Sequence, residues 1–291
     1  FNMGRVGGAS IDEEAYFEIT PNKNKISHDE AIDYSKTLQD FIILSTGKEV
    51  QASSLVGQLE REGQPGYTDI EILFPTSSNL KIPESLHPLK ANFVLADIVD
   101  EFSEVMNNWF LHYEELEPVY NLYFSVQYNS EMYLQNQFLS LTQAIETYHR
   151  REIGGQYTSD DEFEEYYSEI CEIIPDHFDQ SFQDHLEQGT FEYANEYSLR
   201  KRLSELVTEQ DHLLKNLPID IKSGLNEIVN TRNYLTHYDN SISPRANSSE
   251  LYPLILRLRA ILESILLKNL GIPEDQIVER LMQRYSELKD S

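Results

Sequence analysis

The segment from Pro218 to His237, PIDIKSGLNEIVNTRNYLTH, decides how the whole chain is interpreted. Its apolar side chains recur at the spacing of a buried helical stripe, namely Ile221, Leu225, Ile228 and Leu235. At about 100° per residue, Arg232 lies about 20° from Ile221, inside this apolar face. An arginine keeps its charge and is costly to bury alone. Its guanidinium must therefore reach a carboxylate inside the fold, or this face must line a cleft or a subunit interface.

Asn233 and His237 lie four residues apart, on a neighbouring face of the same helix. The helix thus presents a forked cationic donor, an amide and a side chain that titrates near neutrality. Without a metal, these groups can support attack of an RNA 2′-hydroxyl on its adjacent phosphate. A buried Arg–Glu pair, with a histidine favoured at a helix C-terminus, would explain the same residues. The spacing alone leaves both interpretations open.

Helical patterns continue on both sides of this segment, and no convincing strand is predicted after Pro88. The other predicted helices cover 97–116, 130–151, 161–174, 176–188, 191–215, 250–269 and a last amphipathic stretch through Leu288. Pro118 is predicted to close the first of these, and Gly154-Gly155 to end the second. The C-terminal part is therefore predicted to be an α-helical bundle.

The first 90 residues have a mixed pattern. Residues 15–20 and 69–74 have the composition of strands, the second half-buried, and 60–67 is expected to be a loop. Ser27 and Glu30 form a capping-box pattern that predicts a helix ending near Gly47. This portion is predicted to belong to an α+β domain. Because the chain opens with Phe1-Asn2-Met3, we expect it to begin inside a longer protein.

Composition and charge exclude several classes of protein. No apolar run approaches the roughly 20 residues of a membrane span, so an integral membrane protein is excluded. The single cysteine, Cys171, excludes a disulfide framework and fits a reducing cytoplasm. The 50 acidic and 23 basic side chains give a net charge of -27. That balance argues against a broad electrostatic grip on nucleic acid.

The acidic excess is unevenly distributed. Residues 152–198 contain 14 acids and no Lys or Arg, whereas 199–245 contain six acids and seven bases. The acidic stretch is expected to be a solvated face, and its alternative is a nucleic-acid mimic or a cover that repels RNA. A locally cationic cleft in an acidic body would admit a short, structured RNA to a narrow site.

Other chemistry-bearing residues favour structural roles. His177 and His185 lack partners with metal-ligand spacing, so no zinc site is predicted. Cys171 is expected in the core rather than as a nucleophile. Core packing is also expected for a set of aromatic side chains, Trp109, Phe110, Tyr113, Tyr120, Tyr123 and Phe124.

Residues 231–238, TRNYLTHY, resemble the Arg-x4–6-His signature of HEPN domains. Residues 141–150 are similar to the first core helix of the ApeA-like HEPN branch, and 199–203 to a later basic stretch; the resemblance covers about 120–285. Residues 1–115 look like the C-terminal part of the N-terminal domain in ApeA-like anti-phage proteins. The predicted fold is therefore mainly α. A HEPN-type helical bundle over 118–291 follows a partial α+β N-terminal domain over 1–117.

This resemblance implies a dimeric, metal-independent endoribonuclease without a cofactor, whose Arg and His motifs face each other across the subunit interface. By position, Arg232 would bind the scissile phosphate, His237 would act as general acid or base, and Asn233 would support the site. Glu146 matches the acidic residue of the first helix and is the natural partner of Arg232. Replacing Arg232 with alanine is then expected to leave Glu146 unpaired.

The resemblance also implies partners. The expected ones are RNA, with transfer RNA suggested by family behaviour, a second copy in a homodimer or larger homo-oligomer, and a phage protein as trigger, but no membrane. Arg200, Lys201 and Arg202, with Arg150, are candidates for an RNA-binding rim, and a solvated helix face is the equal alternative. The rival function is a non-catalytic HEPN module that senses a phage protein.

Overall fold

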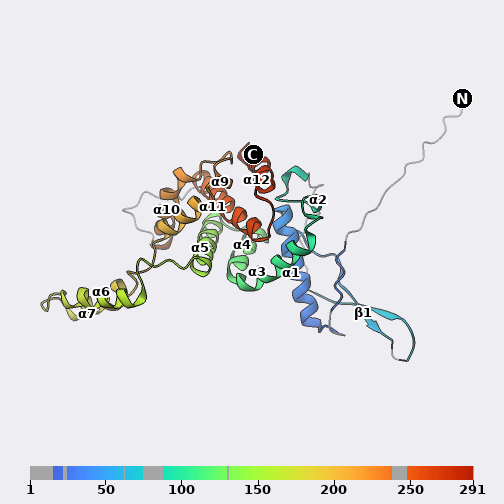
Figure 1. The fold of residues 1–291 in the computed structure, drawn as a ribbon, viewed down its shortest axis with the longest axis horizontal. Coiled ribbons are helices and arrows are strands. Elements are labelled where there is room, and N and C mark those ends of the chain that lie inside the picture. The colour runs from blue at the N-terminus through green and yellow to red at the C-terminus, as the bar shows by residue number, and fades with distance from the viewer. Residues whose placement is uncertain are drawn as a thin grey trace. The chain divides into compact units, whose positions relative to one another are not determined.

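The fold is known from a computed structural model, which describes residues 16–21, 25–61, 63–74, 88–129, 131–237 and 248–290. The chain is mainly α-helical, as predicted, with a two-stranded sheet near its N-terminus (Figure 1). It divides into two compact units. The first comprises residues 1–35 and 54–74, and the second comprises 36–53 and 75–291. The boundary expected at 117/118 falls inside the second unit.

The sheet of the first unit is an antiparallel hairpin of β1 (Val56–Glu60) and β2 (Tyr67–Glu71). The strand expected over 69–74 is thus shifted toward the N-terminus, and β1 was not predicted. Every residue of β2 is exposed, so the prediction that this strand is half-buried was wrong. The reason is that, in the described residues, no second layer packs on the hairpin to bury its apolar face. The strand expected at 15–20 is also wrong where the structure describes it, because residues 16–20 pair with no other strand.

Helix α1 (His28–Thr46) begins at the predicted capping box. The amide of Glu30 donates to Ser27 Oγ at 3.2 Å, and the amide of Ser27 donates to Glu30 Oε2 at 2.7 Å. The helix ends at Thr46, and Gly47 follows it with a φ of 62°, a left-handed conformation that glycine adopts without strain. The second half of α1 buries Leu38, Phe41, Ile43 and Leu44 in the core of the second unit.

The bundle of the second unit is built around α5 (Leu134–Glu152), on which α4 (Glu117–Gln127) and α11 (Ser248–Asn269) pack. The predicted helices are present except for the one expected over 191–215, where residues 192–198 are not helical and two separate helices cover 199–209 and 211–214. Helix α4 was missed. Pro118 does not end a helix; it occupies the first turn of α4, where its missing N–H costs nothing. The remaining elements of the bundle are η1 (Pro88–Lys90), α2 (Leu95–Ile98), α3 (Phe102–Glu115), α8 (Leu199–Glu209), α9 (Asp211–Leu214), η3 (Lys222–Gly224), α10 (Leu225–His237) and α12 (Glu274–Asp290).

Aromatic side chains from α1, α3 and α4 form one end of the core. Trp109 is fully buried and contacts the rings of Phe41, Tyr120 and Phe124. Of the aromatic residues predicted to be core, Phe110 is the exception, because it lies on the exposed side of α3. Buried Asp40 connects the same helices, since it accepts hydrogen bonds from the hydroxyls of Tyr113 (2.6 Å) and Tyr128 (2.5 Å).

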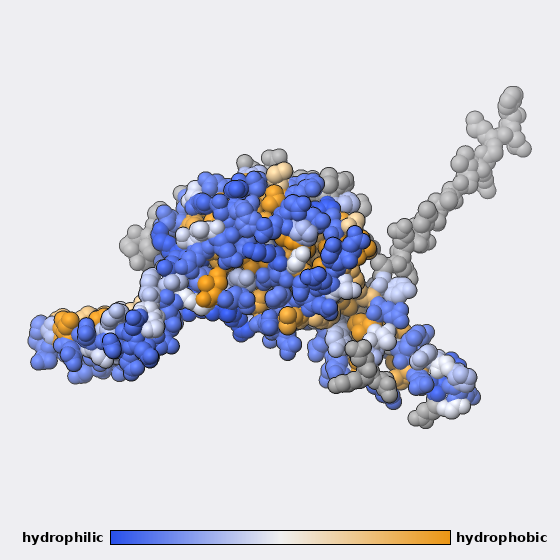
Figure 2. Space-filling model, in the orientation of Figure 1, coloured by the Kyte–Doolittle hydropathy of each residue, from blue (hydrophilic) through white to orange (hydrophobic). Residues whose placement is uncertain are grey.

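Residues 152–198 form a separate acidic arm within the second unit. It contains α6 (Asp160–Glu172), α7 (Gln180–His185) and the π-helical turn η2 (Leu186–Phe191), which lie side by side and bury no residue completely (Figure 1). Hydrophobic surface lies open on the arm (Figure 2). Its exposed large side chains include Tyr166, Ile173 and Phe182. Cys171 is only partly buried here, so its expected core position was wrong: α6 has too little packed around it.

Among the helices of the described segments, none is both long enough and apolar enough to span a lipid bilayer.

Two buried tyrosines of α4 provide a matched test of the core. Burial raises the pKa of both Tyr120 and Tyr123 above the ordinary 10.0. Tyr123 donates to buried Glu263 at 2.9 Å, whereas no partner for the Tyr120 hydroxyl exists among the described residues. We expect Tyr123→Phe to lower the free energy of unfolding by about 1–2 kcal/mol. Tyr120→Phe should leave that energy unchanged or raise it by up to about 1 kcal/mol.

The pH dependence has a definite sign. Above pH 10 the unfolded chain loses tyrosine protons that the folded chain keeps, so stability falls as pH rises toward the folded pKa values. Each Phe variant should make this fall shallower. Urea denaturation at pH 7 and above pH 10 measures both effects. An equal loss at pH 7 for the two variants would mean that Tyr120 has a hydrogen-bond partner after all.

Candidate functional site

Helix α10 carries the residues on which the sequence interpretation depends. It packs on α5 and α8, and its predicted apolar stripe is confirmed, because Ile228 and Leu235 are buried and Leu225 is partly buried. Ile221 is also buried but precedes the helix, since residues 222–224 form the 3₁₀ turn η3. The stripe fixes the rotation of α10 and therefore sets which side chains face α5.

Arg232 faces α5 and is partly exposed, with 34% of its side chain accessible. Its Nη2 lies 3.7 Å from Glu146 Oε2, and its Nη1 donates to Asn233 Oδ1 at 3.3 Å. The expected pairing of Arg232 with Glu146 is thus present. Glu146, on α5, is the carboxylate that holds the guanidinium in place, and Asn233 supports it from the next position on α10.

The sequence left two alternatives for Arg232, a carboxylate partner inside the fold or a position on a cleft or interface. The guanidinium has both a carboxylate partner and a position on a pocket. The pocket has a volume of about 430 Å³ and lies between α5 and α10. Its lining consists of Leu139, Thr142, Gln143, Glu146, Thr147, Arg150, Arg232 and Thr236. Two guanidinium groups, one carboxylate and several hydroxyls suit a hydrophilic anion such as phosphate better than an apolar ligand.

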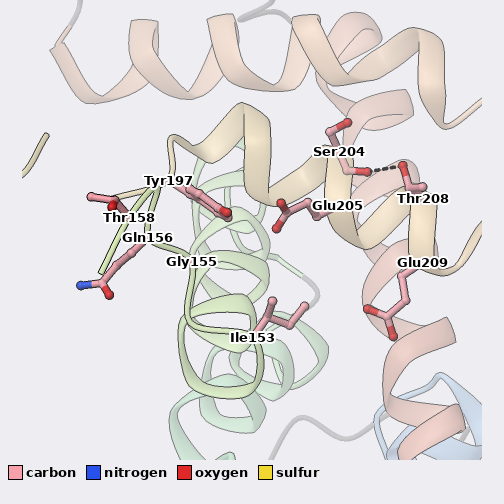
Figure 3. Close-up of a pocket in the computed structure, with 9 residues that line it drawn as sticks. All are labelled: Ile153, Gly155, Gln156, Thr158, Tyr197, Ser204, Glu205, Thr208 and Glu209. Atoms are coloured by element: carbon pink, nitrogen blue, oxygen red, sulfur yellow. Dashed lines mark hydrogen bonds between the residues drawn. The ribbon is translucent and has the colours of Figure 1, made fainter. Parts of the chain in front are cut away.

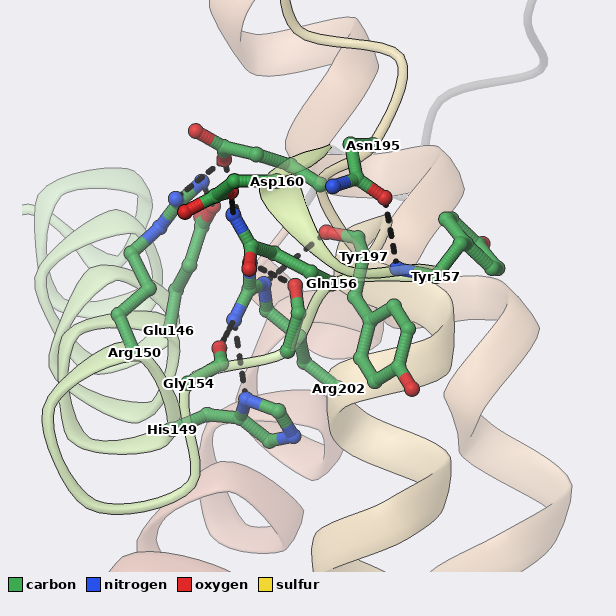
Figure 4. A network of polar contacts seen from close by, with 12 residues as sticks. Glu146, His149, Arg150, Gly154, Gln156, Tyr157, Asp160, Asn195, Tyr197 and Arg202 are labelled. Atoms are coloured by element: carbon green, nitrogen blue, oxygen red, sulfur yellow. Dashed lines mark hydrogen bonds and ion pairs between the residues drawn. The ribbon is translucent and has the colours of Figure 1, made fainter. Parts of the chain in front are cut away.

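Arg150, one turn beyond Glu146 on α5, connects this pocket to the base of the acidic arm. Its Nη2 donates to Glu146 Oε1 at 3.1 Å, and its Nη1 forms an ion pair with Glu196 (Figure 4 shows the surrounding network). Partial burial alone would lower the pKa of Arg150, but the hydrogen bonds that it donates to Glu196 and Glu146 outweigh this effect and raise the pKa. Arg232 and Arg150 thus share Glu146, so loss of Arg232 would not leave Glu146 unpaired, contrary to the expectation from sequence.

Arg202 is not part of an exposed RNA-binding rim. Its side chain is 1% exposed, and its guanidinium donates to the carbonyl oxygens of Gly154 (2.6 Å) and Tyr197 (3.0 Å) (Figure 4). It also contacts His149 Nδ1 at 2.9 Å. Burial and the nearby charge of Arg150 lower the pKa of Arg202. The residue fastens the end of α5 to the start of α8, so that prediction was wrong.

Arg200 and Lys201 lie at the surface of α8. Arg200 is exposed and hydrogen-bonds Asn226 of α10. Lys201 lies 4.0 Å from the centre of the Tyr197 ring and 3.6 Å from Glu205. Arg200, Lys201 and Arg150 remain predicted RNA contacts.

His237 is the last residue of α10 and is exposed. Within the described ranges it forms no hydrogen bond or ion pair, and the pocket is lined by Thr236 instead. The five-residue separation turns His237 about 140° away from Arg232 around the helix axis. The described residues therefore bring Glu146, Arg232 and Asn233 together, and His237 lies outside this group.

A second, larger hollow of about 810 Å³ lies between the end of α5 and α8 (Figure 3). Its charged lining is acidic, from Glu205 and Glu209, and it contains no Lys or Arg. This hollow therefore repels phosphate and is a poor candidate for an RNA site. Within the described ranges, no cluster of three or more His, Cys, Asp or Glu is arranged to hold a metal ion.

Sequence reasoning missed Glu196. It lies 46 residues from Arg150, beyond the reach of any helical spacing. Arg202 carried a usable signal, because it lies three residues after Leu199 and four before Leu206, both buried on α8. The same helical geometry that placed Arg232 on a buried face would have placed Arg202 there too.

Comparison with known proteins finds two family models that match separate segments of the chain. Residues 139–276 match the family model described as Apea-like HEPN. Residues 2–109 match the family model described as ApeA N-terminal domain 1. No curated protein and no solved structure matches the chain. Glu146, Arg232, Asn233 and His237 all lie inside the first match, whereas α4 and most of α12 lie outside both.

Proposed function

Because the chain joins an ApeA N-terminal domain 1 to an Apea-like HEPN domain, we propose that it is a metal-independent endoribonuclease of anti-phage defence. The family is linked to anti-phage defence and RNase activity. The observation that carries the proposal is the exposure and the set of contacts of the Arg232 guanidinium. Its guanidinium is partly exposed, is held by Glu146 and Asn233, and lines a polar pocket.

The chemistry follows from these groups. The 2′-hydroxyl of a ribose attacks its own 3′-phosphate, the bond to the next 5′-oxygen breaks, and the ends become a 2′,3′-cyclic phosphate and a 5′-hydroxyl. Arg232 binds the non-bridging oxygens and stabilises the charge that develops on them. His237 moves the proton as general base or general acid. Glu146 and Asn233 are positioning residues that keep the guanidinium oriented.

We propose that the complete site forms in a homodimer. Arg232 and His237 of one subunit point about 140° apart around α10, so a single pocket does not use both. Two copies that meet along this face would place the His237 of one copy beside the Arg232 of the other. Transfer RNA is the proposed substrate, because a narrow site that contains two arginines in an acidic chain favours a compact, structured RNA.

RNA cleavage in the presence of EDTA tests this proposal. The full chain, incubated with total transfer RNA and excess EDTA, is expected to yield fragments with 2′,3′-cyclic phosphate ends, because Arg232 and His237 replace a metal ion. End-specific ligation and sequencing identify these ends. Cleavage only after Mg²⁺ or Mn²⁺ is supplied, or fragments with 5′-phosphates, would contradict the mechanism.

The second candidate is a non-catalytic module that binds a phage protein. It is favoured by the acidic arm, on which Ile173 is 77% exposed and Tyr166 and Phe182 are also exposed. Such a module would protect cells even when Arg232 and His237 are both replaced by alanine. The nuclease requires that this double variant loses protection, so phage plating on cells that carry it separates the two functions.

A further inference from the structure

The charges around the pocket between α5 and α10 offset one another. Its own lining carries the charges of Arg150, Arg232 and Glu146, a sum of +1. Glu196 adds one more negative charge through its ion pair with Arg150 and brings the sum over these four side chains to zero. A phosphate that enters this neutral cluster must displace a carboxylate before it gains a free guanidinium.

Glu196 is held at this position by the base of the acidic arm. Residues 156 and 196 form an isolated antiparallel bridge, in which the amide of Tyr157 donates to the carbonyl of Asn195 at 3.0 Å. The amide of Tyr197 donates to the carbonyl of Gly155, also at 3.0 Å. The arm therefore leaves the bundle and returns to it at one backbone-paired point, and Glu196 projects from that point toward α5.

Glu196 also has a second cation nearby. Its Oε2 lies 3.9 Å from Nη2 of Arg202, whose guanidinium is fixed by backbone carbonyls. Loss of the Arg150 contact would therefore still leave the Glu196 carboxylate beside the positive charge of Arg202. Arg150 in turn is 44% exposed and keeps Glu146 as its neighbour, so its guanidinium can turn toward a ligand in the pocket.

We propose that Arg150 is a second phosphate-binding arginine of the Arg232 site, and that Glu196 occupies it until an RNA phosphate takes the place of the carboxylate. Arg232 holds the scissile phosphate, and Arg150, on the facing helix, holds a neighbouring phosphate of the same strand. Glu196 is a competing internal anion, so the resting protein admits RNA weakly. The inference rests on the proposed nuclease function for the identity of the ligand.

Binding to an uncleavable RNA tests the inference without relying on the chemistry. The probe is a short 2′-O-methyl RNA of mixed sequence, which lacks the attacking hydroxyl. Glu196→Gln is expected to lower its Kd about two- to fivefold, because the variant removes a partly exposed ion pair from Arg150. Glu192→Gln changes the net charge equally at an exposed arm position without an ion pair to a described residue, and should leave the Kd within about 1.5-fold of wild type.

A double-variant cycle assigns the gain to Arg150. Arg150→Ala should raise the Kd about tenfold, because a charged hydrogen bond to phosphate is lost. Glu196→Gln should then have no effect in the Arg150→Ala background. A purely structural Glu196 would instead lower the melting temperature and change the Kd equally in both backgrounds. An unchanged Kd in Glu196→Gln, no binding at all, or a gain that persists without Arg150 overturns the proposal.

The proposal and the nuclease function fail separately. Tighter binding by Glu196→Gln without cleavage of ordinary RNA would retain the second phosphate site and reject the nuclease. Cleavage of RNA in EDTA, combined with an unchanged Kd in Glu196→Gln, would retain the nuclease and reject the role of Glu196.

Discussion

Replacing His237 with alanine is expected to slow RNA cleavage by about 10²–10⁴-fold, the usual contribution of a general acid or base. The fold should be unaffected, because His237 is exposed at the end of α10 and forms no hydrogen bond or ion pair with the described residues. We expect the free energy of unfolding to change by less than about 0.5 kcal/mol. Single-turnover cleavage in EDTA and urea denaturation measure the two quantities.

His185→Ala is the matched control. His185 is likewise exposed and ends a helix, α7, but lies on the acidic arm. The same chemical change there should leave cleavage within about twofold of wild type. A His237→Ala protein that cleaves as fast as His185→Ala would remove His237 from the mechanism.

A mixture of two inactive variants extends this test to the proposed dimer. When Arg232→Ala and His237→Ala chains are mixed and allowed to exchange, one site of the mixed dimer combines the intact Arg232 and the intact His237. Cleavage should therefore return in the mixture, to no more than about a quarter of the wild-type rate if exchange is random and each dimer has two sites. If each site is complete within one chain, no activity returns.

The sequence predicted the site residues to the extent that their geometry is local. Along one helix, position follows from residue number, so the stripe of Ile228 and Leu235 fixed the face on which Arg232 lies. The position of Arg232 on a buried face called for a carboxylate partner, but the resemblance to the ApeA-like HEPN branch, not helical spacing, identified that partner as Glu146. The catalytic role of Arg232 stays a proposal.

Contacts between segments that are distant in the sequence could not be predicted from it. Glu196 contacts Arg150 because the two ends of the arm pair at the bridge between residues 156 and 196. No periodic pattern in the sequence predicts this bridge. Exposure was misjudged for similar reasons. Arg200, Lys201 and Arg202 are adjacent in sequence, but successive helical residues point about 100° apart, so Arg202 turns inward while Arg200 faces solvent.

The alternating pattern near residue 70 shows a different limit. Alternation predicts two distinct faces of a strand, but burial of one face requires a second layer. No such layer covers β2 in the described part of the first unit, and Ile70 is exposed. The pattern therefore gave the strand and could not give its burial.

Replacing Arg284 with alanine is expected to lower the free energy of unfolding by about 3–5 kcal/mol, because it leaves a buried carboxylate without its cation. Arg284 Nη2 lies 3.3 Å from Glu263 Oε1, and Glu263 is completely buried. Its other partners are neutral, the hydroxyls of Tyr123 at 2.9 Å and Tyr285 at 2.7 Å. Urea denaturation at pH 7 measures the loss.

Arg284 also fixes the end of α1. Its Nη1 donates to Asn92 Oδ1 at 2.9 Å, and Asn92 Nδ2 donates to the carbonyl of Leu44 at 2.8 Å. The guanidinium passes so close to Gly47 that a Cβ there would lie 1.6 Å from Nη1. Alanine therefore removes a cation and a hydrogen-bond donor at a point where α1, α11 and α12 meet.

Arg280→Ala is the control, one turn earlier on the same helix. Arg280 pairs with Asp97 at 2.7 Å, but both side chains retain 17% exposure, so water can solvate the remaining carboxylate. Its loss should cost about 1 kcal/mol. Adding Glu263→Gln to Arg284→Ala should recover part of the larger loss, because a neutral amide is cheaper to bury than an unpaired carboxylate. If Arg284→Ala costs no more than Arg280→Ala, or if Glu263→Gln makes it worse, an unpaired charge is not what destabilises the core.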